Sequence, residues 1–227
     1  MFKKNQAFTM AETLLVIAII GVVAALTIPN MSKSVDEQKY VSQLKTEMTN
    51  IKSAYKAARE KYGDYEEWIY SSSTKSARSY KVGSRILEYM NVDKDCENGE
   101  SLGCFSTSDI NSISGEKAIS SIDTDKEAYK AIVSGSSYAF LCEETFCRIV
   151  VDLDGPQKGY NTYGIDIFDF NIEDTKVNDG DISMDEAPAK CYAGQTPYAC
   201  TAWVLRYSNM DYRKCSSTLN STSTSCN

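Results

Sequence analysis

The chain has 227 residues, of which 31 are acidic and 24 are Lys or Arg, so its formal net charge is −7. This acidic balance argues against direct nucleic-acid binding, which depends on a basic surface. Histidine is absent, which excludes histidine-based catalysis and removes the commonest metal ligand.

The N-terminal segment combines a short basic leader with a long apolar run. Lys3 and Lys4 precede the run, which covers residues 8–28 and contains Glu12 as its only charged residue. As a helix, such a run spans roughly 30 Å, about the thickness of a bilayer core. We therefore predict a transmembrane helix over residues 8–30. A carboxylate inside it is costly in lipid and is a functional candidate by default.

Three kinds of export segment are compatible with this pattern. A secretory signal would be cleaved near Ala24 and Ala25, whereas a signal anchor would stay uncleaved. Both leave Glu12 as an uncompensated cost. In the third kind, the chain is cut before the apolar run, which creates an ammonium on Phe8 about one helical turn from Glu12. Two buried charges are tolerated better as a pair than singly.

Residues 7–12, Ala-Phe-Thr-Met-Ala-Glu, and the apolar residues that follow resemble the class III signal of type IV prepilins and type II secretion pseudopilins. The resemblance covers residues 1–35, and Pro29 matches a proline that the family often has in this helix. Two positions depart from the family pattern. Ala7 stands where the family usually has Gly, and Met10-Ala11 stand where it usually has Leu-Ile.

This resemblance implies how the chain is processed and what it binds. A prepilin peptidase would remove the leader, residues 1–7, by cutting between Ala7 and Phe8, and would methylate Phe8. Glu12 and Pro29 would serve assembly into a filament of this chain alone or mixed with other pilins. An assembly platform with its ATPase would drive this step. The helix would lie in the inner membrane as a single pass, with the head in the periplasm or on a cell-surface filament.

Residues 31–63 have the apolar periodicity of an amphipathic helix, which we expect to form a stalk ending at Gly63. Its apolar stripe must be covered, and the chain's own sheet is a better cover than a coiled-coil partner. The stripe is expected to contain Tyr40 or Val41, Leu44, Met48, Ile51, Tyr55, Ala58 and Tyr62. The opposite, solvated side is expected to contain Lys39, Lys45, Glu47, Lys52, Lys56 and Glu60.

The remaining residues, 64–227, are expected to form a globular head of the α+β class. A hairpin of residues 137–142 and 146–153, a strand over 163–172 and a return strand over 181–184 predict an antiparallel sheet over about 137–184. Upstream, we predict a polar loop over 71–79, a short helix over 84–92, a loop region over 93–123 and one or two helical turns over 126–134. The resemblance implies a pilin-like fold, in which the sheet packs on the long N-terminal helix.

Eight cysteines follow the predicted transmembrane helix, four of them in a Cys-rich tail over residues 187–227 that also contains a predicted short helix at 200–206. An even count without a CxxC motif indicates disulfides formed in an oxidising compartment. Short spacing favours the pairs Cys96–Cys104 and Cys142–Cys147. The order of pairing among the other four stays open; they are Cys191, Cys200, Cys215 and Cys226.

The sequence contains no nucleophile, phosphate-binding or zinc motif, and we expect the chain not to be an enzyme. Oxygen ligands at Asp152, Asp154, Asn161 and Asp166 make calcium the only cofactor that we consider, although their spacing differs from that of an EF-hand. The expected function is that of a structural pilin or pseudopilin subunit. The alternative is a single-pass, membrane-anchored extracytoplasmic binding domain that does not polymerise.

Overall fold

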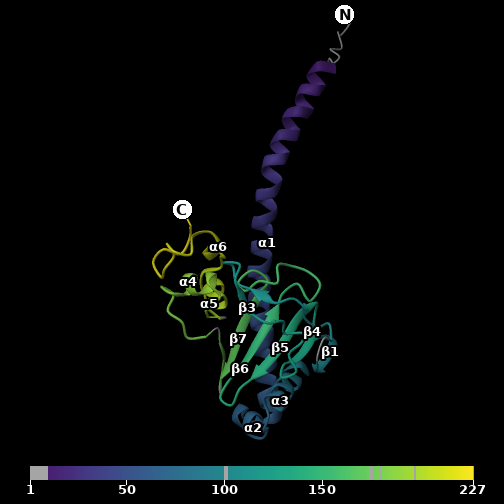
Figure 1. The fold of residues 1–227 in the computed structure, drawn as a ribbon, viewed down its shortest axis with the longest axis vertical. Helices are drawn as coiled ribbons and strands as arrows, with labels where there is room; N and C mark the ends of the chain where they lie inside the picture. Colours follow the sequence, from purple (N-terminus) through teal and green to yellow (C-terminus); the bar gives the residue numbers. More distant parts are fainter. Residues whose placement is uncertain (1–9, 100–101, 174–175, 179, 197, 227) are drawn as a thin grey trace, which may run out of the picture. The chain divides into compact units, whose positions relative to one another are not determined.

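Helix α1, Met10–Tyr62, opens the described part of the chain (Figure 1). The computed structural model describes residues 10–99, 102–173, 176–178, 180–196 and 198–226, without the side chains of residues 24–35. The chain divides into two compact units, Met1–Lys39 and Tyr40–Asn227. We call them the N-terminal unit and the globular unit and describe each by itself.

In the N-terminal unit, the large apolar side chains described between Met10 and Val23 are all exposed. Among the described residues, no helix meets both the length and the hydropathy that a bilayer crossing requires. The predicted transmembrane helix, residues 8–30, falls partly outside the described residues, because Phe8, Thr9 and the side chains of residues 24–30 are not described. The predicted leader, residues 1–7, lies entirely outside them.

In the globular unit, the second part of α1 buries the predicted apolar stripe. Leu44, Ile51 and Ala58 are fully buried, and Tyr62 is partly buried against the same core. The helix ends as predicted at Gly63, whose φ of 82° lies in the left-handed region and whose N–H donates to the Arg59 carbonyl at 3.0 Å. The predicted amphipathic periodicity is therefore confirmed for this unit.

A polar row on α1 runs beside the stripe and contradicts one part of the prediction. Glu47, expected in solvent, is buried, and its carboxylate accepts hydrogen bonds from the hydroxyls of Ser136 (3.0 Å) and Tyr138. One turn earlier, the Gln43 amide donates to Ser136 and to the Leu153 carbonyl. Because a buried carboxylate is tolerated only when it is hydrogen-bonded, these contacts fix how α1 lies against the sheet.

A six-stranded antiparallel sheet with the strand order β1-β4-β5-β6-β7-β8 packs on α1. The predicted hairpin of β5 and β6 is confirmed. The third predicted strand begins later than expected, because residues 162–166 form a turn, and the return strand is β8 rather than residues 181–184. The strands are β1 (Val92–Asn98), β4 (Tyr129–Val133), β5 (Ser136–Cys142), β6 (Cys147–Asp152), β7 (Ile167–Glu173) and β8 (Lys176–Asn178).

Both faces of this sheet are buried. Phe140, Ile149 and Phe168 face the core that contains α1, whereas Val150 and Ile167 belong to a second core on the other face. That second core is covered by the chain between β1 and β4, including the two-stranded ladder of β2 (Ile110–Asn111) and β3 (Lys117–Ile119). The prediction of a loop region over residues 93–123 is therefore wrong in part, since β1, β2 and β3 lie in it.

The predicted helical turns over residues 126–134 are wrong, because residues 129–133 of this stretch form strand β4. Lys130, the second residue of β4, is fully buried, and its ammonium donates to the backbone carbonyls of Gly99, Ile122, Asp123 and Asp125. These acceptors satisfy a charge whose burial would otherwise be prohibitive. Three of the acceptors lie in the irregular chain just before β4, and Gly99 directly follows its neighbour β1, so no periodic pattern reveals them.

Two short helices follow α1, namely α2 (Tyr65–Tyr70) and α3 (Lys75–Leu87), and α3 lies against β5. Thr74 caps α3 by accepting a hydrogen bond from the Ala77 N–H at 3.2 Å. The predicted polar loop over residues 71–79 thus includes the first turn of a helix. The predicted helix over residues 84–92 corresponds only to the last turn of α3 and the turn after it.

The C-terminal region contains α4 (Ala187–Tyr192), α5 (Ala199–Tyr207) and α6 (Tyr212–Cys215), and α5 confirms the helix predicted over residues 200–206. Helix α5 covers the part of β7 that β8 leaves unpaired. There the Asp169 N–H donates to the Thr201 hydroxyl at 3.2 Å. All eight cysteines form disulfides: Cys96–Cys104, Cys142–Cys147, Cys191–Cys200 and Cys215–Cys226. Both pairs predicted from short spacing are confirmed.

We predict that Ile51→Ala lowers the free energy of unfolding by about 2–5 kcal/mol, because it removes a fully buried side chain between α1 and the sheet. Thr49→Ala, on the exposed side of the same helix, should change it by about 0.5 kcal/mol or less. Urea unfolding of the full-length protein, followed by tryptophan fluorescence, measures both values. Equal effects of the two substitutions would contradict this account of the core.

Candidate metal centre

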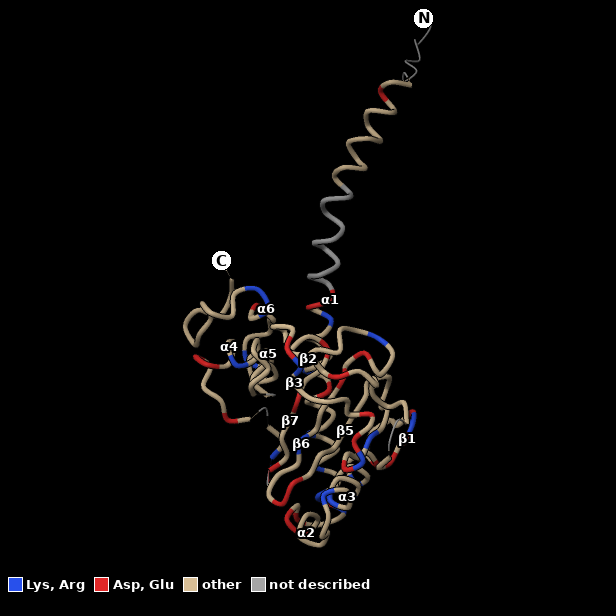
Figure 2. Tube along the Cα trace, viewed as in Figure 1, with Lys and Arg blue, Asp and Glu red and all other residues tan. Residues whose placement is uncertain are grey.

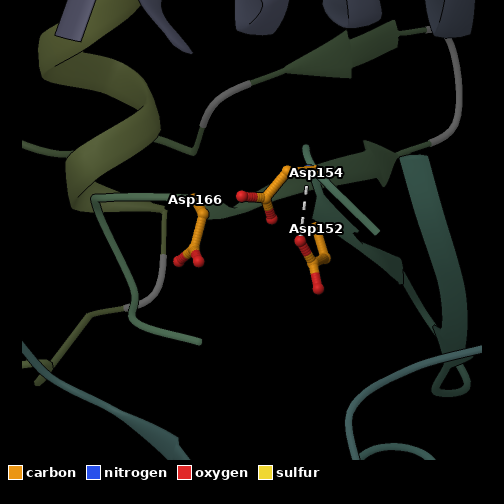
Figure 3. Close-up of side chains that lie close together, drawn as sticks. All are labelled: Asp152, Asp154 and Asp166. Carbon is orange, nitrogen blue, oxygen red and sulfur yellow. Dashed lines mark hydrogen bonds between the residues drawn. The ribbon is translucent and has the colours of Figure 1, made fainter. Parts of the chain in front are cut away.

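Three of the four predicted oxygen ligands come together where β6 ends and β7 begins. Asp152 is the last residue of β6, Asp154 lies two residues further, and Asp166 directly precedes β7 (Figure 3). Pairing of Asp152 with Ile167 in the ladder brings the two strand ends together. One carboxylate oxygen from each aspartate lies within 4.8 Å of the others, which is a spacing that one cation can bridge.

The chain between Asp154 and Asp166 folds around the Asp166 carboxylate. One oxygen accepts the N–H groups of Tyr160 and Asn161 (2.7 Å for Asn161), and the other accepts the Thr162 N–H at 2.8 Å. These bonds fix the carboxylate and leave one lone pair, on the oxygen that accepts only the Thr162 N–H. Asp166 is therefore positioned by the backbone rather than by a counter-charge.

Burial and mutual repulsion perturb two of these carboxyl groups. Desolvation, followed by the nearby Asp166 and Asp154 carboxylates, raises the pKa of Asp152 to about 9. Desolvation also raises the pKa of Asp166 to about 6, although its backbone N–H partners oppose that shift. Near neutral pH, Asp152 therefore retains its proton, and a cation that binds here must displace it.

The surroundings of the cluster fit an oxygen-ligated cation. A buried oxygen of Asp154, Oδ1, has no hydrogen-bond partner. Gly159, with φ of 86°, passes so close that a Cβ at this position would overlap the carboxylate oxygens of Asp154 and Asp166. Carboxylates without nitrogen or sulfur ligands favour Ca²⁺ or Mg²⁺ over transition metals.

Asn161, the fourth predicted ligand, is placed differently. Its side-chain amide donates to the carbonyls of Ser108 and Asp109 at 3.2 and 2.7 Å, and so ties the loop to the outer layer of the unit. Sequence reasoning missed Tyr40, whose hydroxyl donates to the second oxygen of Asp154 at 2.9 Å. The sequence pattern places Tyr40 only in the apolar stripe. Its hydrogen-bond partner is 114 residues away in the chain and cannot be recognised from local spacing.

The site residues predicted in the N-terminal unit form no part of this cluster. Ala7 and Phe8 lie outside the described residues. Glu12 lies exposed in the first turn of α1, and Pro29 lies within the same helix without a described side chain.

Comparisons with protein-family models, with curated proteins and with solved structures found no match. The function has to be inferred from the residues and geometry of this chain.

We predict that CaCl2 raises the melting temperature of the full-length protein and that a chelator reverses the increase, because the three aspartates are brought together only in the folded state, which the cation therefore stabilises. Asp154→Asn should remove most of this response. Glu144→Gln, at the exposed turn of the β5–β6 hairpin, should retain it. An unchanged melting temperature of the wild-type protein across the calcium titration would exclude the site.

We further predict that the metal-free protein loses stability as the pH rises from about 4 to about 9. The folded Asp152 holds its proton until its pKa of about 9, whereas in the unfolded chain it releases the proton near 3.8, so the folded state binds more protons between these values. One proton corresponds to about 1.4 kcal/mol per pH unit. Unfolding across this range in chelator should therefore show a flatter profile for Asp152→Asn, and an identical slope would refute the assignment.

Proposed function

We propose that this chain is a structural subunit of a pilin-like filament, of the type IV pilus or type II secretion pseudopilus kind. The single observation that carries the proposal is the position of Glu12. It is the only charge in the apolar run, and it lies one helical turn after the point where removal of the leader would create an ammonium. That cut places an ammonium within reach of the carboxylate, and the other export schemes do not.

Two features of the fold support this proposal. Helix α1 continues without interruption from Met10 to Tyr62, and the antiparallel sheet covers the apolar stripe of its second part. Filament subunits need such a division, because one part of the helix must pack against other subunits while the rest anchors the displayed domain. The α+β class and the four disulfides suit a domain that works outside the cytoplasm.

In this proposal, a prepilin peptidase removes residues 1–7 and methylates Phe8 while the helix lies in the inner membrane. An assembly platform and its ATPase then move the subunit into a filament of one or several pilins. Between subunits, the Phe8 ammonium and the Glu12 carboxylate pair and set the axial register. Calcium acts as a structural ion that holds the loop between Asp154 and Asp166, and the chain performs no catalysis.

N-terminal mass spectrometry of the protein isolated from its cells tests the processing step. The proposal expects a mature chain that begins at a methylated Phe8. An intact Met1 would refute it and favour the anchored binding domain that does not polymerise. A start after Ala25 would also refute it, because most of the apolar run would then be removed.

We predict that Glu12→Val abolishes filament assembly while the protein stays in the membrane fraction, because the substitution removes the partner of the Phe8 ammonium. Thr13→Val, in the same turn of the helix, changes no charge and should assemble normally. Electron microscopy of sheared and periplasmic fractions, together with membrane fractionation, gives both readouts. Normal filaments from Glu12→Val would refute the role assigned to this carboxylate.

A further inference from the structure

A groove on the globular unit runs between the last turns of α1 and strand β8. Its volume is about 830 Å³. Tyr55 and Val177 contribute to its floor, and both are mostly buried. Its charged lining comes from Lys52, Lys56, Arg59, Glu60, Asp64 and Lys176.

The described part of this groove is basic, although the chain as a whole is acidic. Lys52 and Lys56 lie one helical turn apart on α1 and are exposed, as is Lys176 on β8. Of the two acidic residues in the lining, Asp64 already pairs with Arg59 at 2.8 Å. Lys52 also lines a second hollow next to the groove, whose lining adds the cations Lys45 and Arg206 and one acidic residue, Asp181. The basic face thus extends along α1.

The opposite edge of the same sheet carries negative charge. Strand β1 is at one end of the strand order and β8 is at the other. Asp93, Asp95 and Glu97 alternate along β1 and are exposed, and the intervening Lys94 donates to the Leu102 carbonyl. Register shifts interrupt the pairing of β1 with β4, as is common where a sheet edge must not pair with arbitrary strands.

Two of the acidic side chains of β1, Asp93 and Asp95, are held in place by hydrogen bonds. The Asp95 carboxylate accepts the Tyr129 hydroxyl at 2.8 Å and the Glu97 N–H at 2.9 Å. The Asp93 carboxylate accepts the Gly135 N–H at 2.8 Å. Because these residues are already oriented, a partner that binds them loses less conformational entropy than it would with mobile side chains.

We propose that the basic groove between α1 and β8 binds the acidic β1 edge of a second copy of this chain. The inference rests on the proposed function, because it supplies a contact between the globular units of a filament. Acidic residues are spread over this unit (Figure 2), so unguided association of two copies is repulsive. A basic groove facing an acidic edge reverses that repulsion in one orientation only. Since the two surfaces differ and lie on opposite edges of the sheet, the contact is head-to-tail and continues from copy to copy.

Charge reversal tests the contact in the full-length protein within its assembly system. The groove variant carries Lys52→Glu and Lys56→Glu, and the edge variant carries Asp95→Lys and Glu97→Lys. Each is expected to reduce filament mass about tenfold, because like charges then face each other. A chain that carries all four substitutions is expected to recover assembly. Lys117→Glu with Lys214→Glu, outside both surfaces, controls for net charge and is expected to assemble normally.

Thiol crosslinking provides a second measurement that does not depend on the charge variants. Since all native cysteines are paired, Lys56→Cys combined with Asp95→Cys introduces the only free thiols. Oxidation of the assembled protein is expected to give a ladder of dimers, trimers and higher species. Either single substitution is expected to leave the protein monomeric, because its thiol then faces a residue without one.

The outcomes separate the contact from the proposed function. Recovery of assembly by the fourfold variant, together with the crosslinked ladder, establishes the contact. Normal filaments from both the groove and the edge variant overturn it and leave the proposed function intact. Loss of assembly in the groove variant without recovery also overturns it and assigns the groove to another acidic partner. A wild-type chain that forms no filaments overturns the proposed function and this contact with it.

Discussion

The globular unit depends on the burial of one apolar stripe on α1. Leu44, Ile51 and Ala58 cannot be solvated without large cost, and one face of the antiparallel sheet provides the cover. Apolar packing alone does not determine the position of a helix along a sheet. The polar row of α1 does, since Gln43 and Glu47 find their partners only where β5 and β6 present Ser136, Tyr138 and the Leu153 carbonyl.

The same row connects the helix to the aspartate cluster. Tyr40, one turn before Gln43, donates to Asp154, and Gln43 donates to the carbonyl of the residue between Asp152 and Asp154. A change in the charge or position of these carboxylates therefore acts on the first turn of α1 within the globular unit. The candidate metal centre and the anchoring of the stalk helix are parts of one hydrogen-bonded network, so an ion bound there would also strengthen the attachment of α1.

The spacing of apolar residues along the sequence predicted those parts of the fold in which the same kind of contact recurs at regular intervals. The stripe of α1 and the β5–β6 hairpin follow from spacing and from short turns. Lys130 and Glu47 show what periodicity cannot supply: each is charged and buried, and each is satisfied by groups outside its own helix or strand. Likewise, three of the four predicted oxygen ligands cluster because β6 and β7 pair, but the Asn161 amide turns toward residues 108 and 109. Such partners depend on tertiary placement.

The disulfides have a consequence for how this chain matures. The cysteines pair in sequence order, first with second, third with fourth and so on, and the two members of a pair are 8, 5, 9 and 11 positions apart. An oxidant that joins thiols in the order in which they emerge during export gives the native connectivity directly, without reshuffling by an isomerase. None of the four bonds ties the stalk helix to the sheet. The disulfides stabilise local loops, whereas helix α1 is held against the sheet only by non-covalent contacts.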